Sequence, residues 1–197
     1  MVTGQDIVNS AYKLLGAPYR AWTPDAPLPM WLNDGAGNPP PASHMLQVGC
    51  MCMDLISWAM MDNSLETVYG TEALENFLVN TQDFDPNSPG EAGAIAYDPY
   101  ISSAKGSQGH AALFVNEHTL IQALDGGTGW YGVTDAHTDY ETYAQGGDLQ
   151  FTRYGYLPNV QYENTPDPTP NTPLWQQFGW YEAINAQWDL RWHPPAA

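Results

Sequence analysis

Two cysteines, Cys50 and Cys52, are the residues of this chain best suited to nucleophilic chemistry. A reactive thiol must ionise near neutral pH, which a helix N-terminus, a histidine partner, or both promote. Cys52 is followed by Leu55, Ile56 and Ala59 at positions i+3, i+4 and i+7, which predicts a buried helix with Cys52 in its first turn. The alternative is that both cysteines are small buried apolar side chains, as free cysteines usually are.

His110 is the histidine best placed to act as a base, because it opens the strand-like run GHAALFV. The next run, TLIQAL, carries the polar Gln122 among apolar residues. If the two strands form a hairpin around NEHT, Gln122 lies beside His110 and can fix the tautomer of the ring. An outward-facing Gln122 in ordinary strand alternation fits the spacing equally well. The remaining histidines are expected at the surface: His44, His118, His137 and His193.

Metal and cofactor signals in the sequence are incomplete. Asp83, Asp85 and Asn87 have the spacing of a calcium loop, but Ser88 replaces its glycine and Ala94 replaces its final glutamate. No H-E-x-x-H or paired-histidine zinc motif occurs. We therefore expect no cofactor and assign no metal ligands, while a calcium site stays open as an alternative in so acidic a chain.

The charge excludes several partners. Five basic side chains against 22 acidic ones leave a formal charge of −17. Phosphate backbones and anionic membrane surfaces repel such a protein, so we expect it to bind neither nucleic acid nor membranes. The sequence MVTGQDIVNSAYKLLG has no basic start and places Asp6 where a secretion signal is apolar. We expect synthesis in the cytoplasm without a signal peptide.

Helices are predicted in the first half of the chain. Apolar residues at helical spacing predict a first helix that ends at Gly16, with Pro18 just beyond. The residues at this spacing are Ile7, Ala11, Leu14 and Leu15. Residues 17–43 are rich in Pro and Gly and are predicted to form an irregular loop, which at this length is more often functional than not. A further short helix is predicted over residues 71–79.

Strands are predicted in the second half. From Gly93 onward, short aromatic and aliphatic runs are separated by Gly, Asn and Asp: AIAY, HAALFVN, TLIQAL, GWYGVT and DLQFTRYGYL. They predict a meander of about five antiparallel strands. Helices first and strands later indicate an α+β domain, with N-terminal helices packed on the antiparallel sheet.

A Pro-rich stretch divides the chain. Residues 163–173, ENTPDPTPNTP, are predicted to be an extended linker. They separate a domain at 1–162 from a tail at 174–197. Aromatic rings recur in the tail at three- and four-residue steps, which predicts a short helix with an aromatic face. That face either folds back on the domain or docks on a partner or a second domain.

Five segments follow one another in a characteristic order: AYKLLGAPYRAW, MCMDLISWAM, GAIAYDP, GHAALFV and TLIQAL. In this order they resemble the motifs of the NlpC-type cell-wall peptidases, papain-like cysteine enzymes related to the CHAP amidases. The family has a helix with a Pro-Tyr motif, a D-C-S-G-L-V motif, a G-D strand, an H-V-G-I-Y strand and a third motif with His, Asn or Gln. The resemblance spans residues 5–155 and implies the papain-like fold for this domain.

The resemblance also implies roles for individual residues. Cys52 is the implied nucleophile, His110 the base, and Gln122 the third residue that orients the imidazole. Tyr19 and Trp22 are the implied substrate-binding residues at the cleft. The backbone N–H of Cys52 is expected to help bind the oxyanion.

The chain departs from the family pattern at several positions. Met51 stands where the family has Asp before the nucleophile, and Met53 and Asp54 replace the following Ser-Gly. Ala94 replaces the Asp of the G-D strand motif. These departures bear on substrate choice more than on fold.

The family hydrolyses amide bonds in peptidoglycan stem peptides, commonly between D-glutamate and the diamino acid. The resemblance thus implies a monomeric thiol endopeptidase whose partner is bacterial peptidoglycan. Three alternatives stay open: an N-acetylmuramoyl-L-alanine amidase of the same fold, a catalytically dead wall-binding protein, and a phage tail-tip protein. Together with the linker, the resemblance suggests a bacteriophage lysin, or the N-terminal module of one. Such a lysin reaches the wall after holin-type release or within a virion.

Overall fold

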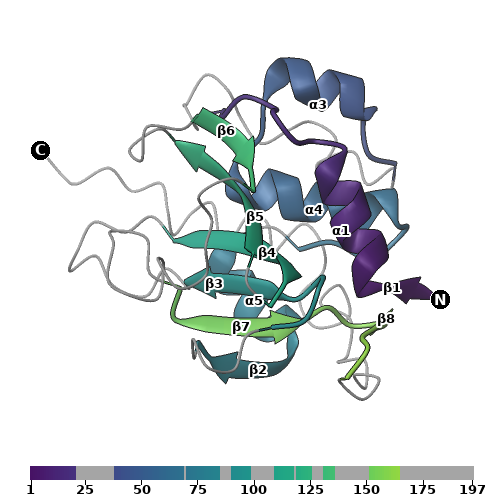
Figure 1. The fold of residues 1–197 in the computed structure, drawn as a ribbon, viewed down its shortest axis with the longest axis vertical. Helices are drawn as coiled ribbons and strands as arrows, with labels where there is room; N and C mark the ends of the chain where they lie inside the picture. The colour runs from purple at the N-terminus through teal and green to yellow at the C-terminus, as the bar shows by residue number, and fades with distance from the viewer. Residues whose placement is uncertain are drawn as a thin grey trace, which may run out of the picture.

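The protein is described by a computed structural model, drawn in Figure 1. The structure describes residues 1–20, 38–68, 70–84, 90–98, 109–117, 119–125, 131–135 and 151–164. The predicted tail at 174–197 and the predicted linker from residue 165 onward lie outside these ranges. Within them the chain is mixed α and β, with helices first and an antiparallel sheet after them, which is consistent with the α+β prediction.

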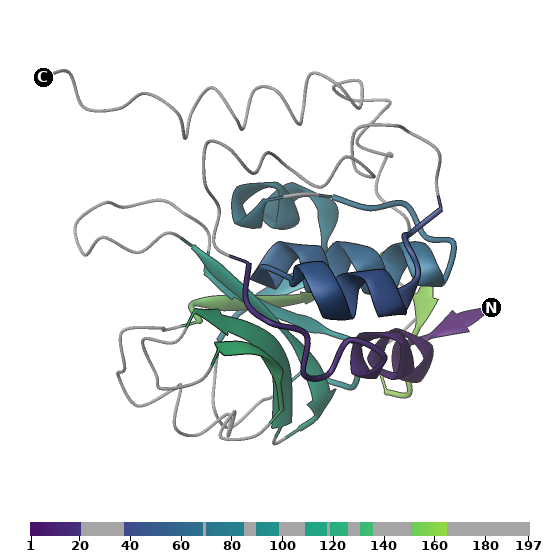
Figure 2. The same cartoon turned by 90° about the horizontal axis from the view of Figure 1, so that it is seen from above.

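The described helices are α1 (Gly4–Tyr12), α3 (Ala42–Val48), α4 (Cys52–Asp62) and α5 (Thr71–Phe77). α3, α4 and α5 lie on the same side of the main sheet (Figure 2). The sequence analysis did not predict α3, because its buried residue is Met45 alone and one apolar contact makes no periodic pattern. None of the described helices has the length and apolar character needed to cross a membrane.

α1 begins with a capping box. Asp6 N donates to Thr3 Oγ1 at 3.2 Å, and Thr3 N donates to the Asp6 carboxylate at 2.9 Å. The hydrogen bonds from the Thr3 hydroxyl and backbone N–H lower the pKa of Asp6. The helix ends at Tyr12, and Leu15 is 43% exposed in the turn that follows. The prediction that this helix runs to Gly16 is therefore wrong at its end, because residues 13–16 form a turn.

α4 is the central helix. Nine consecutive residues, Met53 to Met61, are buried, and the helix packs against α1, β4 and β5. Trp58 Nε1 donates to Pro40 O at 2.8 Å, which ties the preceding segment to the helix. Full burial of one large apolar side chain stabilises a fold by about 1.5–3 kcal/mol. A helix buried on all sides therefore holds its first residue, Cys52, in a fixed place.

The main sheet has six antiparallel strands in the order β2-β7-β3-β4-β5-β6. Their bounds are β2 (Val79–Asp83), β3 (Ile95–Asp98), β4 (His110–Asn116), β5 (Thr119–Asp125), β6 (Tyr131–Thr134) and β7 (Arg153–Tyr156). β3 to β6 follow one another as a meander, as predicted. β7 instead returns to the other side of β3, and β2 lies beyond it.

The prediction of a simple five-stranded meander is thus wrong at one side of the sheet. α5 ends at Phe77, two residues before the predicted end, because Leu78 is already extended. Val79 then pairs with Tyr156 as the first residue of β2. A separate two-stranded parallel sheet joins β1 (Val2–Thr3) to β8 (Val160–Gln161).

Candidate active site

His110 and Gln122 lie side by side on neighbouring strands. The predicted hairpin forms, since β4 ends at Asn116 and β5 begins at Thr119. His110 Nε2 is 2.6 Å from Gln122 Oε1, and Gln122 is fully buried. The alternative of an outward-facing Gln122 is therefore wrong, because its side chain points into the protein and toward the imidazole.

This contact sets the tautomer of the imidazole. An amide oxygen only accepts hydrogen bonds, so the Nε2 of His110 carries the proton. In the neutral ring the lone pair is then on Nδ1, the nitrogen that can act as a base. Gln122 Nε2 is buried and has no hydrogen-bond partner among the described residues. Gln122 thus serves the histidine through its oxygen, at a cost in stability for the unpaired amide N–H groups.

Phe151 covers one face of the imidazole. Its ring is stacked on His110 with centroids 5.5 Å apart and planes 25° from parallel, and Phe84 packs 5.8 Å from Phe151. Asp98 lies opposite His110 in the register of β3 and β4 and accepts a hydrogen bond from Thr152 Oγ1 at 2.9 Å. The ring is therefore held by a hydrogen bond at its edge and a stacked ring on its face.

The two cysteines differ sharply in their surroundings. Cys50 is fully buried, whereas Cys52 is partly exposed and is the first residue of α4. Burial, aided by the negative charge of Asp54 and opposed by Arg20, raises the pKa of Cys50 to about 12. Cys50 therefore stays a thiol at neutral pH. Of the two, only Cys52 combines exposure with a helix N-terminus, where the dipole favours a thiolate.

A backbone ladder fixes the segment that leads into α4. Cys50 N donates to Pro18 O at 2.9 Å and Arg20 N donates to Cys50 O at 3.2 Å, so Tyr19 and Cys50 form a parallel bridge. Gly49 has φ 90° and ψ 172°, a conformation that is essentially restricted to glycine. A Cβ at Gly49 would lie 2.5 Å from Pro18 O. Close approach of the two segments therefore requires glycine here.

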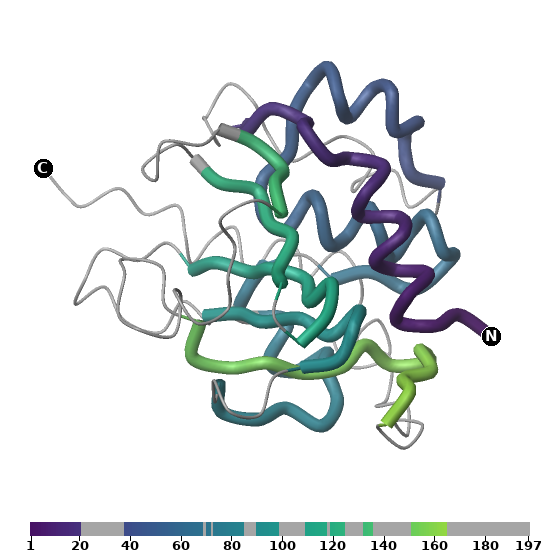
Figure 3. The backbone as a smooth tube through the Cα atoms, viewed as in Figure 1, coloured from purple at the N-terminus to yellow at the C-terminus, as the bar shows by residue number. Residues whose placement is uncertain are grey.

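The same N-terminal segment reaches the strands that carry the histidine pair. Gly16 N donates to Val133 O at 2.9 Å and Val133 N donates to Ala17 O at 2.8 Å. Figure 3 shows this N-terminal segment of the backbone passing beside β6. In β6, Thr134 lies opposite Gln122. The backbone around Cys50 is thus connected through residues 16–20 and β6 to β5.

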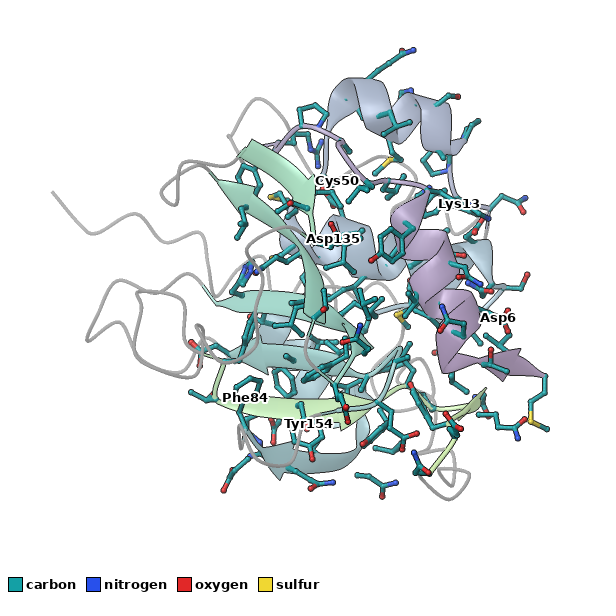
Figure 4. The ribbon with its side chains drawn as sticks, viewed as in Figure 1. Asp6, Lys13, Cys50, Phe84, Asp135 and Tyr154 are labelled. Atoms are coloured by element: carbon teal, nitrogen blue, oxygen red, sulfur yellow. The ribbon has the colours of Figure 1, made fainter. Side chains whose placement is uncertain are left out.

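This connection places the cysteine segment at one end of the molecule. Cys50 lies near β6 and the Asp135 that follows it, far from Phe84 and Tyr154 at the β2–β7 side (Figure 4). α4, which begins at Cys52, packs against β4 and β5. His110 and Gln122 therefore lie on the two strands against which α4 packs.

A buried carboxylate shapes the first turn of α4. Asp54 is fully buried and accepts a hydrogen bond from Met51 N at 2.9 Å. Arg20 Nη2 lies 3.5 Å from the same carboxylate oxygen and is itself buried without a hydrogen-bond partner in the described part of the chain. The contact is therefore an ion pair rather than a hydrogen bond.

The predicted site residues fall into two groups. His110 and Gln122 are in direct contact, and Tyr19 is bridged to Cys50, two residues before Cys52. Trp22 lies outside the described residues.

Three residues around the site were not singled out from the sequence. Asp54 could have been identified from the sequence, because a carboxylate inside an apolar helix needs a hydrogen-bond or ion-pair partner if it is buried. Arg20 stood in the segment that matches the Pro-Tyr motif, but nothing local identified its partner. Phe151 was expected within a strand, whereas it lies just before β7, where its ring reaches His110.

Within the described ranges, no group of three or more His, Cys, Asp or Glu side chains is placed to hold a metal ion. Asp85, Asn87 and Ser88 of the calcium-like run lie outside these ranges. A scan against protein-family models and a search of curated proteins find no match to the chain.

Proposed function

We propose that the chain is a papain-like cysteine peptidase of the NlpC type that hydrolyses the D-glutamyl-diamino acid bond of peptidoglycan stem peptides. The observation that carries the proposal is the contact of 2.6 Å between His110 Nε2 and Gln122 Oε1. A buried amide oxygen on one imidazole nitrogen is the arrangement that prepares the other nitrogen to act as a base. Cys52 at the first residue of a helix packed on the same strands supports it.

The reaction is acyl transfer in two steps. Cys52 Sγ attacks the scissile carbonyl carbon while His110 Nδ1 takes the thiol proton, forming the C–S bond and an oxyanion. The backbone N–H of Cys52, at the start of α4, donates to the oxyanion. Collapse breaks the C–N bond, and His110 gives its proton to the leaving amine. Water then attacks the thioester with His110 as base, and the proton returns to the thiolate.

Gln122 acts through His110. Its oxygen holds the proton on Nε2 and stabilises the imidazolium that forms when Nδ1 is protonated. Phe151 shields one face of the ring from water, and Tyr19 and Trp22 contribute to substrate binding. The chain acts as a monomer on bacterial peptidoglycan, without a metal or cofactor, as a phage lysin released through a holin or carried in a virion.

Mass spectrometry of diaminopimelate-type peptidoglycan tests the proposal. The wild-type protein is expected to produce new free amines on the diamino acid, Cys52→Ala none, and Cys50→Ala products like the wild type. Release of intact stem peptides instead would identify an amidase of the same fold. No product from any variant, with the wall still bound, would contradict the proposal and favour a wall-binding protein.

A further inference from the structure

Arg20 is the described Lys or Arg residue that lies beside Cys50 and Asp54. The other two described ones have partners elsewhere: Lys13 pairs with Asp62, and Arg153 pairs with Glu75 at 3.0 Å. In a chain with a formal charge of −17, a cation placed against one buried carboxylate is a specific arrangement rather than a general property of the surface.

The carboxylate of Asp54 has two opposing effects on Cys52. By accepting the hydrogen bond from Met51 N at 2.9 Å, it defines where α4 begins. Its negative charge helps to raise the pKa of the Cys50 thiol, an effect that Arg20 opposes. The carboxylate is bonded to the N–H of Met51, the residue directly before Cys52, so the same charge opposes a thiolate at the start of the helix. A like charge close to a titrating thiol raises its pKa, so an uncompensated Asp54 would oppose the effect of the helix dipole on Cys52.

We propose that Arg20 is a positioning residue that cancels the charge of Asp54, so that Cys52 ionises beside a neutral pair. This inference rests on the proposed role of Cys52 as nucleophile. The backbone of Arg20 is bonded to Cys50 O at 3.2 Å, and its Nη2 lies 3.5 Å from Asp54. One residue therefore aligns the segment before the nucleophile and neutralises the carboxylate after it.

The other titratable groups around the start of α4 come from neighbouring segments. Cys50 is fully buried and stays protonated at neutral pH. Tyr19 lies on the segment bridged to Cys50, and His110 lies on β4, against which α4 packs. Arg20 differs from all three in being permanently charged, so its effect on Cys52 is present across the whole pH range of interest.

The test is the pH profile of iodoacetamide alkylation at Cys52, assigned by peptide fragmentation, with Cys52→Ala giving the background from Cys50. Arg20→Gln is expected to raise the midpoint by about one pH unit and to slow alkylation at neutral pH about tenfold. Arg20→Lys keeps the charge and is expected to stay near the wild type. Asp54→Asn is expected to lower the midpoint, and the double variant Arg20→Gln/Asp54→Asn to return it to near the wild-type value.

Lys13→Gln is the matched control, because it breaks an ion pair at the other end of the same helix and is expected to leave the profile unchanged. A wild-type midpoint in Arg20→Gln would overturn the inference while leaving the proposed function standing. If Arg20→Gln does not fold, Asp54→Asn decides, and an unchanged midpoint there overturns the inference. Wild-type Cys52 that reacts no faster than Cys50 would instead overturn the proposed function.

Discussion

The two ends of α4 are each joined to the N-terminal segment by an ion pair, and the two pairs differ in burial and in hydrogen bonding. At the start of the helix, Asp54 is fully buried and Arg20 Nη2 approaches it to 3.5 Å without a hydrogen bond. At its end, Lys13 Nζ lies 2.6 Å from Asp62, and their side chains are 53% and 21% exposed. Ser10 Oγ donates to the same oxygen of Asp62 at 2.5 Å.

The difference shows that the two pairs serve different purposes. An exposed pair contributes about 0–1 kcal/mol because water screens it. A buried pair loses the hydration of both ions, a penalty that often exceeds their attraction, and here no hydrogen bond from Nη2 offsets it. The pair at the end of α4 is thus an ordinary surface contact. The pair at its start instead provides a buried carboxylate with a counter-ion.

The largest expected difference is in stability. Arg20→Gln removes the cation beside the buried carboxylate of Asp54, so we expect it to lower the free energy of unfolding by about 3–5 kcal/mol. Lys13→Gln should lower it by at most about 1 kcal/mol. Urea unfolding measures both. Equal, small losses would mean that the carboxylate of Asp54 is hydrated, and the contrast between the two ends would fail.

A pair of glycines tests whether the start of α4 is fixed by close backbone approach. Gly49→Ala introduces a Cβ 2.5 Å from Pro18 O at a φ of 90°, so we expect a loss of about 3 kcal/mol. Gly16 also has a positive φ, 83°, but a Cβ there meets no atom within 4 Å. Gly16→Ala should therefore cost only about 1 kcal/mol. Thermal unfolding compares them, and similar losses would remove the argument from close approach.

At alkaline pH, the buried Cys50 before α4 should contribute to a loss of stability. The pKa of Cys50 is raised from 9.0 to about 12, chiefly by burial, so the folded state holds this proton more tightly than the unfolded chain. The stabilisation is complete below pH 9.0 and is lost as the pH rises toward 12. Tyr12, whose pKa burial and the bond to Asp135 raise to about 12, adds to the same loss.

Cys50→Ala separates the two contributions. Its urea midpoint should fall less steeply with rising pH than that of the wild type, while a Tyr12→Phe variant should show a smaller change in slope, because Tyr12 is less buried than Cys50. An unchanged slope in Cys50→Ala would show that the thiol is accessible to water in the folded protein.

At acid pH, the end of α4 should show a smaller effect of opposite sign. Burial alone would raise the pKa of Asp62, but hydrogen bonds from Lys13 and Ser10 outweigh it, and the pKa lies below 3.8. The stabilisation is present above pH 3.8 and is lost as the pH falls through the lowered value. Asp62→Asn should flatten this loss by at most about 1 kcal/mol, as urea midpoints below pH 5 would report. A wild-type slope would indicate that the surface pair contributes nothing.

The features predicted from sequence are those set by short-range patterns. The apolar residues at positions i+3, i+4 and i+7 after Cys52 predicted α4. A hairpin between the two following strands was the condition under which His110 could contact Gln122, only 12 residues away in sequence. The pairing of β7 with β3 joins distant segments, so no local period signals it. The ion pair between Arg20 and Asp54 is missed for the same reason. The sequence alone does not show which acidic side chain a basic side chain will contact in the fold.

We propose that Cys52 and His110 act together as one thiol and imidazole pair. Alkylation by iodoacetamide at neutral pH tests it directly, with the modified cysteine identified by mass spectrometry in the wild type and in His110→Ala. We expect Cys52 to react much faster than Cys50 in the wild type, and His110→Ala to abolish the difference. Equal, slow labelling of both cysteines in the wild type, or fast labelling of Cys52 that survives the loss of His110, would contradict it.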